Sequence, residues 1–209
     1  SALKYLVRGH APPITGAQLE FMTDSRTQMT KSASDLFPDH DGATPSAARA
    51  GAAHATGILP AHAIRALVKD QQIWGTREIE DNQVQPASLD LRLGQTAYRL
   101  RASFLPGPKS SVMEKVEAFS FHKIDLTEGA VLETGCVYLV PLMEALALSE
   151  RTSASANPKS STGRLDVFTR LITDHGSEFD QVEAGYKGHL YLEISPRTFS
   201  VLARAGSRL

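Results

Sequence analysis

The sequence predicts a mainly β domain with a few short helices over residues 57–209. Apolar and polar residues alternate over residues 88–93, where three leucines share one face, and this period of two is typical of a half-buried strand. Short apolar segments also recur between glycine and proline residues, as around the Pro-Gly-Pro of residues 106–108. Short strands with frequent turn residues indicate an all-β architecture with a few helices.

Composition excludes several classes of function. The chain has 209 residues, enough for one domain with its own core, and a formal net charge of −1. That charge lacks the basic footprint of a DNA- or RNA-binding protein, although a small phosphorylated ligand needs only a few local cations. No apolar run reaches the roughly 20 residues that a bilayer requires. Cys136 is the only cysteine, which fits a reducing compartment and leaves no cysteine cluster for zinc. Taken together, these features lead us to expect a cytoplasmic protein that binds no nucleic acid, membrane or zinc.

Residues 1–56 differ in composition from the rest of the chain. Their apolar residues are scattered, and residues 43–55 form an alanine-rich run without a Phe, Tyr or Trp. Such a run buries too little apolar area to offset its ordering entropy. We therefore expect a flexible extension with at most transient helix.

From residue 57 onward the sequence predicts regular elements. Pro60 followed by Ile64, Leu67 and Val68 at helical spacing predicts an amphipathic helix over residues 60–72. Strands are expected over residues 88–93, 98–104, 119–126 and 137–140. Later, Leu165, Phe168, Leu171 and Ile172 restore a helical period and predict a short buried helix.

A candidate phosphate site precedes that predicted helix. Residues 157–164 read Asn-Pro-Lys-Ser-Ser-Thr-Gly-Arg, which brings Lys159 and Arg164 together with the hydroxyls of Ser160 and Ser161. Backbone amides at a helix start bind anions, and these side chains suit a phosphate. The alternative is that the serines only cap the helix, which is the commoner role.

A candidate catalytic carboxylate lies in the predicted strand at residues 189–194. Leu190, Leu192 and Ile194 share one face, so Glu193 lies on the other. One interpretation is that this face is solvated. The other is that it lines a pocket in which Glu193 takes and gives protons.

Three stretches resemble one family in order. Residues 85–94 resemble the early strand motif of dCTP deaminases, which belong to the trimeric dUTPase superfamily. Residues 159–164 resemble the second motif, Arg-Ser-Ser followed after two residues by Arg. Residues 183–188, continued by residues 192–195, resemble the third, in which an Asp-x-Gly-aromatic-x-Gly turn leads into the strand bearing the catalytic Glu. Each motif alone is weak, but their order and spacing make the resemblance specific.

The resemblance implies a distorted β-barrel or jelly-roll-like fold of the dUTPase type. It also implies a trimer or pseudo-trimer with active sites between modules, and zinc-independent deamination of dCTP to dUTP with Mg²⁺ bound to the triphosphate. The chain is most similar to the first half of long-form bacterial members, in which two modules are fused in tandem. Because the sequence stops within residues 205–209, inside the turn before the family's final strand, we expect a truncated domain.

The same resemblance assigns roles to individual residues. Glu193 would be the proton shuttle, and Ser160, with a backbone carbonyl near Asp174 or His175, would hold the attacking water. The substrate-binding residues would contact either the triphosphate, namely Lys159, Ser161 and Arg164, or the deoxyribose and base, namely Val182, Glu183 and Tyr186.

Two residues depart from the family pattern. Lys159 stands where the family usually has Arg, which replaces a two-pronged contact by a point charge. Glu183 replaces the usual Asp and is longer by one methylene. Two alternatives therefore stay open: a dUTPase-like or bifunctional pyrophosphohydrolase in which Glu183 activates water, and a catalytically silent module that completes or regulates an oligomer.

Overall fold

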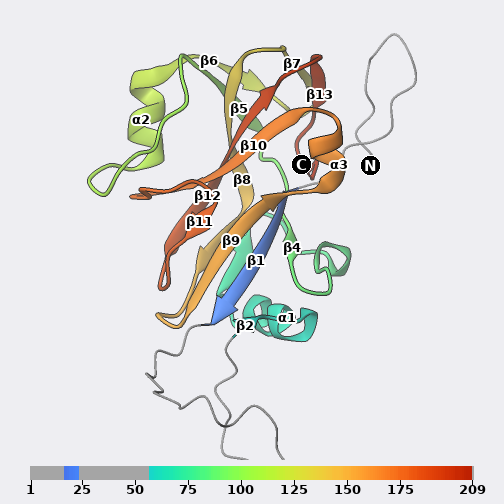
Figure 1. The fold of residues 1–209 in the computed structure, drawn as a ribbon, viewed down its shortest axis with the longest axis vertical. Helices are drawn as coiled ribbons and strands as arrows, with labels where there is room; N and C mark the ends of the chain where they lie inside the picture. The colour runs from blue at the N-terminus through green and yellow to red at the C-terminus, as the bar shows by residue number, and fades with distance from the viewer. Residues whose placement is uncertain (1–16, 24–56, 209) are drawn as a thin grey trace, which may run out of the picture.

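A computed structural model describes residues 17–23 and 57–208, which form a mainly β fold with short helices at its margins (Figure 1). This confirms the predicted fold class. The elements of the first half are β1 (Ala17–Thr23), β2 (Gly57–Ile58), α1 (Ala61–Lys69), β3 (Ile73–Gly75), the 3-10 helix η1 (Asp81–Gln83), β4 (Leu89–Asp90), β5 (Thr96–Leu100) and α2 (Val112–Phe119). Those of the second half are β6 (Ser120–Asp125), β7 (Ala130–Leu132), β8 (Val137–Ala147), β9 (Thr152–Pro158), α3 (Ser160–Arg164), β10 (Val167–Thr173), β11 (Gln181–Val182), β12 (Lys187–Pro196) and β13 (Val201–Ala203).

The described strands form three antiparallel sheets. One sheet has the order β11-β9-β1-β2, with β4 also pairing with β1. The second has the order β10-β12-β8-β5-β6, with β3 also pairing with β8. A small third sheet joins β13 to β7. The main hydrophobic core takes side chains from both large sheets, including Phe21 of β1, Val140 of β8 and Leu192 of β12.

A second, smaller apolar cluster covers the other face of the β10-β12-β8-β5-β6 sheet. It joins Val112 and Val116 of α2 to Leu139, Tyr191 and Ile172 of the sheet. The helix begins at a capping box in which the Ser111 hydroxyl accepts a hydrogen bond from the Glu114 amide. The sequence analysis did not predict α2, although Ser-x-x-Glu before apolar residues was a readable signal.

Strand β1 corrects the expectation for the N-terminal region. Residues 17–23 are not a flexible extension, because every one of them pairs with a residue of β9, from Ala17 opposite Pro158 to Thr23 opposite Thr152. Leu19 and Phe21 are fully buried in the main core. The alternation of these two apolar residues with polar neighbours was short enough to be overlooked. Residues 1–16 and 24–56, to which the same expectation applied, lie outside the described residues.

Two further expectations need correction. The helix expected over residues 60–72 is α1, which ends earlier because Gln71 adopts a positive φ of 58°. The helix expected from Leu165 to Ile172 is wrong, because Asp166, with φ 53°, ends α3 and residues 167–173 form strand β10. Threonine and β-branched residues in this stretch favour a strand, and the pairing with β12 overrides the coincidental helical spacing.

The position of β1 gives the first prediction. Phe21→Ala should lower the free energy of unfolding by about 3–5 kcal/mol, because it leaves a cavity in the main core. Met22→Ala is the matched control on the same strand, since Met22 is 40% exposed and should lose little. Urea denaturation measures both. Equal, small losses for the two variants would show that β1 contributes nothing to the stability of the core.

Candidate active site

Glu193 lies in the middle of the larger sheet. Its strand, β12, pairs with β10 on one side and β8 on the other, which places Glu193 between Arg170 and Leu139. The residue is only 1% exposed, so the interpretation as a solvated strand residue is wrong. The sequence alternation assigned Glu193 to the correct face, but that face is covered by the second apolar cluster rather than by water.

Arg170 compensates the charge of the buried Glu193 carboxylate. The guanidinium donates to Glu193 Oε1 from Nη2 at 2.7 Å and from Nε at 3.1 Å. The other oxygen, Oε2, is buried and has no hydrogen-bond partner among the described residues. An unpaired buried acceptor costs about 1–3 kcal/mol, more when it is charged. The sequence analysis did not select Arg170, because only the strand register shows that it faces Glu193.

Lys159 and Arg164, the two candidate phosphate cations, lie in different surroundings. Lys159, at the start of α3, donates from Nζ to Asp90 Oδ2 at 2.5 Å, whereas Arg164 at the end of α3 is exposed. Lys159 is therefore an ion-paired cation held against β4. Ser160 and Ser161 belong to α3, but their side chains lie outside what the structure describes.

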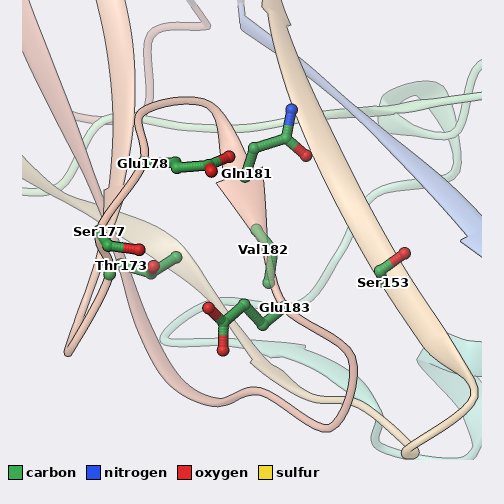
Figure 2. Close-up of a pocket in the computed structure, with 8 residues that line it drawn as sticks. Ser153, Thr173, Ser177, Glu178, Gln181, Val182 and Glu183 are labelled. Atoms are coloured by element: carbon green, nitrogen blue, oxygen red, sulfur yellow. The ribbon is translucent and has the colours of Figure 1, made fainter. Parts of the chain in front are cut away.

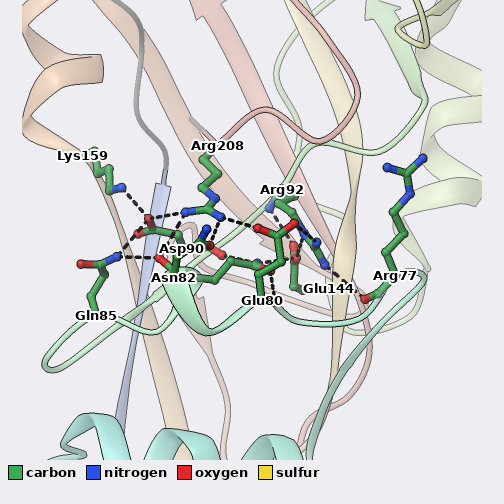
Figure 3. Close-up of polar contacts among 10 residues, drawn as sticks. Arg77, Glu80, Asn82, Gln85, Asp90, Arg92, Glu144, Lys159 and Arg208 are labelled. Atoms are coloured by element: carbon green, nitrogen blue, oxygen red, sulfur yellow. Dashed lines mark hydrogen bonds and ion pairs between the residues drawn. The ribbon is translucent and has the colours of Figure 1, made fainter. Parts of the chain in front are cut away.

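Asp90 connects Lys159 to a chain of charged side chains (Figure 3). Arg208 Nη1 lies 3.7 Å from Asp90 Oδ2 and its Nη2 lies 3.3 Å from Glu80 Oε2. Asp90 Oδ1, like Glu193 Oε2, is buried without a hydrogen-bond partner in the described part of the chain. Strand β4 was expected to be half-buried, but Asp90 is 1% and Arg92 4% exposed, so both faces are covered.

The row of charged side chains that begins at Lys159 ends in a buried ion pair between Arg92 and Glu144. Arg92 Nε donates to Glu144 Oε1 at 2.8 Å, the Arg92 amide donates to Oε2 at 2.7 Å, and Gln83 Nε2 donates to Oε1 at 3.0 Å. Both oxygens of Glu144 are thus satisfied, and the residue is fully buried. Its role is structural, since it joins η1, the segment after β4, and β8.

This ion pair gives the second prediction. Glu144→Gln should destabilise the fold by about 3 kcal/mol, because the amide leaves the buried Arg92 charge without its partner. Glu128→Gln, at an exposed carboxylate, should leave stability within experimental error. Thermal unfolding followed by circular dichroism compares the two. A Glu144→Gln protein as stable as the Glu128→Gln protein contradicts the assignment.

Val182, Glu183 and Tyr186 lie together on β11 and the following turn. Val182 is buried opposite Ala154 of β9, while Glu183 is exposed. Glu183 and Val182 line a pocket of about 240 Å³ together with Ser153 of β9 and residues from the end of β10 onward (Figure 2). The remaining lining residues are Thr173, Gly176, Ser177, Glu178 and Gln181.

The turn depends on glycine and on Tyr186. Gly185 has φ +79°, and a side chain there would bring its Cβ within 2.6 Å of Glu150. The Tyr186 hydroxyl donates to the His189 carbonyl at 2.6 Å and accepts from the Asp174 amide at 3.2 Å. Burial raises the pKa of Tyr186. Burial and the nearby Asp174 carboxylate also raise the pKa of Tyr191 to about 12.

The predicted site residues occupy three places rather than one. Helix α3 precedes β10, Arg170 lies three residues beyond the start of that strand, and Thr173 of the pocket lies three residues further. Each of these two three-residue intervals along β10 is about 10 Å long, at roughly 3.3 Å per residue. Alternation along β10 also puts Arg170 and Thr173 on opposite faces of the sheet. The Glu183 pocket therefore lies beyond Arg170 along β10, at the end of that strand.

Residues 55–209 match the family of the 2'-deoxycytidine 5'-triphosphate deaminase (DCD) N-terminal domain. With a mainly β fold and a buried carboxylate flanked by cationic and turn motifs in the expected order, the chain belongs to this family. A crystal structure of 2'-deoxycytidine 5'-triphosphate deaminase from Agrobacterium tumefaciens is similar, with a TM-score of 0.71 and 61% sequence identity. That match covers 73% of this chain and 46% of that chain.

Curated relatives are more distant. The "dCTP deaminase, dUMP-forming" of Pseudarthrobacter chlorophenolicus is 28% identical over 132 residues, which is 63% of this chain and 65% of the relative. The "dCTP deaminase" of Halorubrum lacusprofundi is 28% identical over 116 residues, 55% of this chain and 54% of the relative. The chain thus spans less than two thirds of these relatives and less than half of the solved chain. No helix in the described part of the chain is long and apolar enough to cross a membrane.

Proposed function

We propose that the chain takes part in the hydrolytic deamination of dCTP to dUTP and ammonia, in the cytoplasm. The observation that carries the proposal is the buried Glu193 carboxylate, one oxygen of which has no hydrogen-bond partner among the described residues, in a chain of the dCTP deaminase family. Attack of water at C4 of cytosine requires a base for the water, a proton for the ring nitrogen and a proton for departing ammonia. One carboxylate that alternates between base and acid performs all three transfers.

The remaining residues bind and orient the nucleotide in this proposal. Ser160 and a backbone carbonyl near Asp174 or His175 hold the attacking water, while the triphosphate lies against Lys159, Ser161 and Arg164. Holding the triphosphate far from C4 fixes the base against Glu193, and orientation of this kind supplies a large share of the rate. Val182, Glu183 and Tyr186 contact the deoxyribose and base.

Magnesium enters this scheme as part of the substrate. No group of three His, Cys, Asp or Glu side chains suited to a metal gathers among residues 17–23 and 57–208. A magnesium ion on a triphosphate keeps several waters and needs at most one or two protein carboxylates, so this donor set is compatible with substrate-borne Mg²⁺. Zinc has no role in the proposal.

The separation of the candidate residues supports an oligomeric site. Glu193 lies in the middle of the β10-β12-β8-β5-β6 sheet, whereas Thr173 of the Glu183 pocket lies at the end of β10, so the candidate substrate contacts are spread along one strand. We propose that modules assemble as a trimer, or as a pseudo-trimer in a tandem protein, so that each site combines elements of two modules.

The third prediction tests the role of Glu193. Glu193→Gln should lower the kcat for ammonia release from dCTP by at least about 10²-fold, because the amide keeps the shape of the side chain but cannot accept a proton. Nucleotide affinity, measured by calorimetry, should change little. Near-normal deamination by this variant would remove Glu193 from the mechanism.

Arg164→Ala is the contrasting variant. It removes an exposed cation from the proposed phosphate contact, so its main effect should be a roughly 10-fold weaker binding of dCTP with a smaller loss of kcat. Both variants are compared in the full chain. If neither wild type nor variants release ammonia while dCTP still binds, the catalytically silent module becomes the better description.

A bifunctional activity is the second candidate. Two observations favour it: the Pseudarthrobacter relative bears the name "dUMP-forming", and Glu183 lines a pocket of its own. In this reaction a water activated by Glu183 attacks the α-phosphate and releases pyrophosphate, leaving dUMP.

The fourth prediction separates the two activities. In a bifunctional protein, Glu183→Gln should suppress pyrophosphate release by about 10²-fold and leave ammonia release largely intact, so that dUTP accumulates. Chromatography of the products from dCTP and Mg²⁺ resolves dUTP from dUMP. If the wild type forms dUTP and no dUMP, the chain is a deaminase without the second step.

A further inference from the structure

The two oxygens of the Glu193 carboxylate lie in different surroundings. Both donors of Arg170 converge on Oε1, at 2.7 and 3.1 Å, while Oε2 is buried without a partner among the described residues. In the structural Arg92–Glu144 pair the guanidinium likewise engages one oxygen, but the Arg92 backbone amide satisfies the other. Glu144, whose two oxygens are both satisfied, shows what a structural carboxylate looks like in this same fold.

Arg170 is held in place by contacts other than that with Glu193. The guanidinium carbon lies 3.8 Å from the centre of the Phe179 ring and 4.9 Å from that of Phe168. Nη2 also donates to Ser103 Oγ at 2.7 Å, which ties Arg170 to the loop after β5. Stacking between rings and a third hydrogen bond fix the plane of the guanidinium.

We propose that Arg170 is a positioning residue for the deamination reaction. It engages Oε1, fixes the orientation of the carboxyl group, and leaves Oε2 as the atom that accepts and returns the proton. The inference rests on the proposed function of Glu193. The proton taken from water onto Oε2 passes to the base, so the carboxylate is regenerated, while the guanidinium stays protonated throughout.

Other titratable groups lie near Glu193, and their effects on a pH profile must be distinguished from that of Glu193. Asp180 lies beside β10, accepts a hydrogen bond from the Leu171 amide at 2.7 Å, and has a pKa raised by burial. Tyr191 lies two residues away on the same face. Across β8, where Leu139 is the apolar neighbour of Glu193, Tyr98 pairs with Leu139 and Lys123 pairs with Tyr98. Asp180, whose pKa the charge of Glu193 also raises, is one acidic group that could imitate Glu193 in a pH profile, and Asp174 near Tyr191 is another.

The fifth prediction is a change in the pH profile of kcat. In Arg170→Gln, the acid limb of kcat should move to higher pH, because removal of a cation beside a carboxylate favours its protonated form. The KM for dCTP should stay within about 3-fold, since Arg170 does not bind the phosphates. Arg170→Lys keeps the charge but offers a less rigid contact, so its acid limb should stay near that of wild type while kcat falls about 10-fold.

Asp180→Asn is the matched control. Asp180 has φ 62°, a conformation that Asn tolerates, and the Asn oxygen can still accept from the Leu171 amide. Its acid limb should coincide with that of wild type. If the acid limb of Asp180→Asn shifts as much as that of Arg170→Gln, the limb belongs to Asp180 and the proposal is overturned. The proposal also fails if Arg170→Gln keeps the wild-type acid limb and shows only a lower melting temperature.

An infrared titration provides a readout that does not need turnover. The carboxyl band absent from Glu193→Gln belongs to Glu193, and in Arg170→Gln its protonation should move to higher pH by the same amount as the kinetic limb. If the wild type shows no ammonia release, the proposed function fails while this titration still tests the Arg170 contact. If Arg170→Gln does not fold, Arg170→Lys decides, and a wild-type kcat in that variant overturns the proposal.

Discussion

The pairing of β12 with strands on both its edges is the constraint on which the rest of the site depends. A strand in the middle of a sheet, with clusters of apolar side chains over both faces, has no solvated side on which to place a carboxylate. Glu193 is accommodated because the register of β10 puts Arg170 directly opposite it. The same register orders α3, the Arg170–Glu193 pair and the pocket along one strand. Local backbone pairing therefore sets both the charge balance and the layout of the site.

Buried charges in this fold divide into satisfied and unsatisfied groups, and the division separates structure from function. Glu144 receives three hydrogen bonds and joins distant segments of the chain. Glu193 and Asp90 each keep one buried oxygen without a partner in the described region. An unpaired buried acceptor costs free energy, so these two oxygens are the positions in the described region at which a further donor would be accommodated. Asp90 also holds Lys159, which places that unpaired oxygen beside the proposed phosphate contact.

The sequence predicted the strands with clear alternation and the order of the motifs, because these depend on local period and spacing. Leu190, Leu192 and Ile194 face the main core as their alternation required. Sequence reasoning failed where tertiary pairing decides the outcome: residues 167–173 are a strand despite helical spacing, and β1 is ordered by β9. Arg170 could not be identified as the partner of Glu193, since 23 residues separate them and only the register brings them together. The Ser111 capping box was visible in the sequence and was overlooked.

The distribution of the candidate residues along β10 bears on the proposed assembly of modules. The proposed phosphate contacts lie at one end of β10, the Glu183 pocket lies at the other, and Glu193 lies opposite Arg170 between them. In the proposed assembly, a substrate bound at Glu193 in one module would take part of its sugar or phosphate contacts from a second module. An adjacent module could bring its own α3 or turn to that surface, and the buried charge pair would then be completed by the substrate rather than by the chain. Under this arrangement, assembly and catalysis depend on the same groups, because the unpaired oxygen of Glu193 finds its donor only after the second surface has positioned the nucleotide.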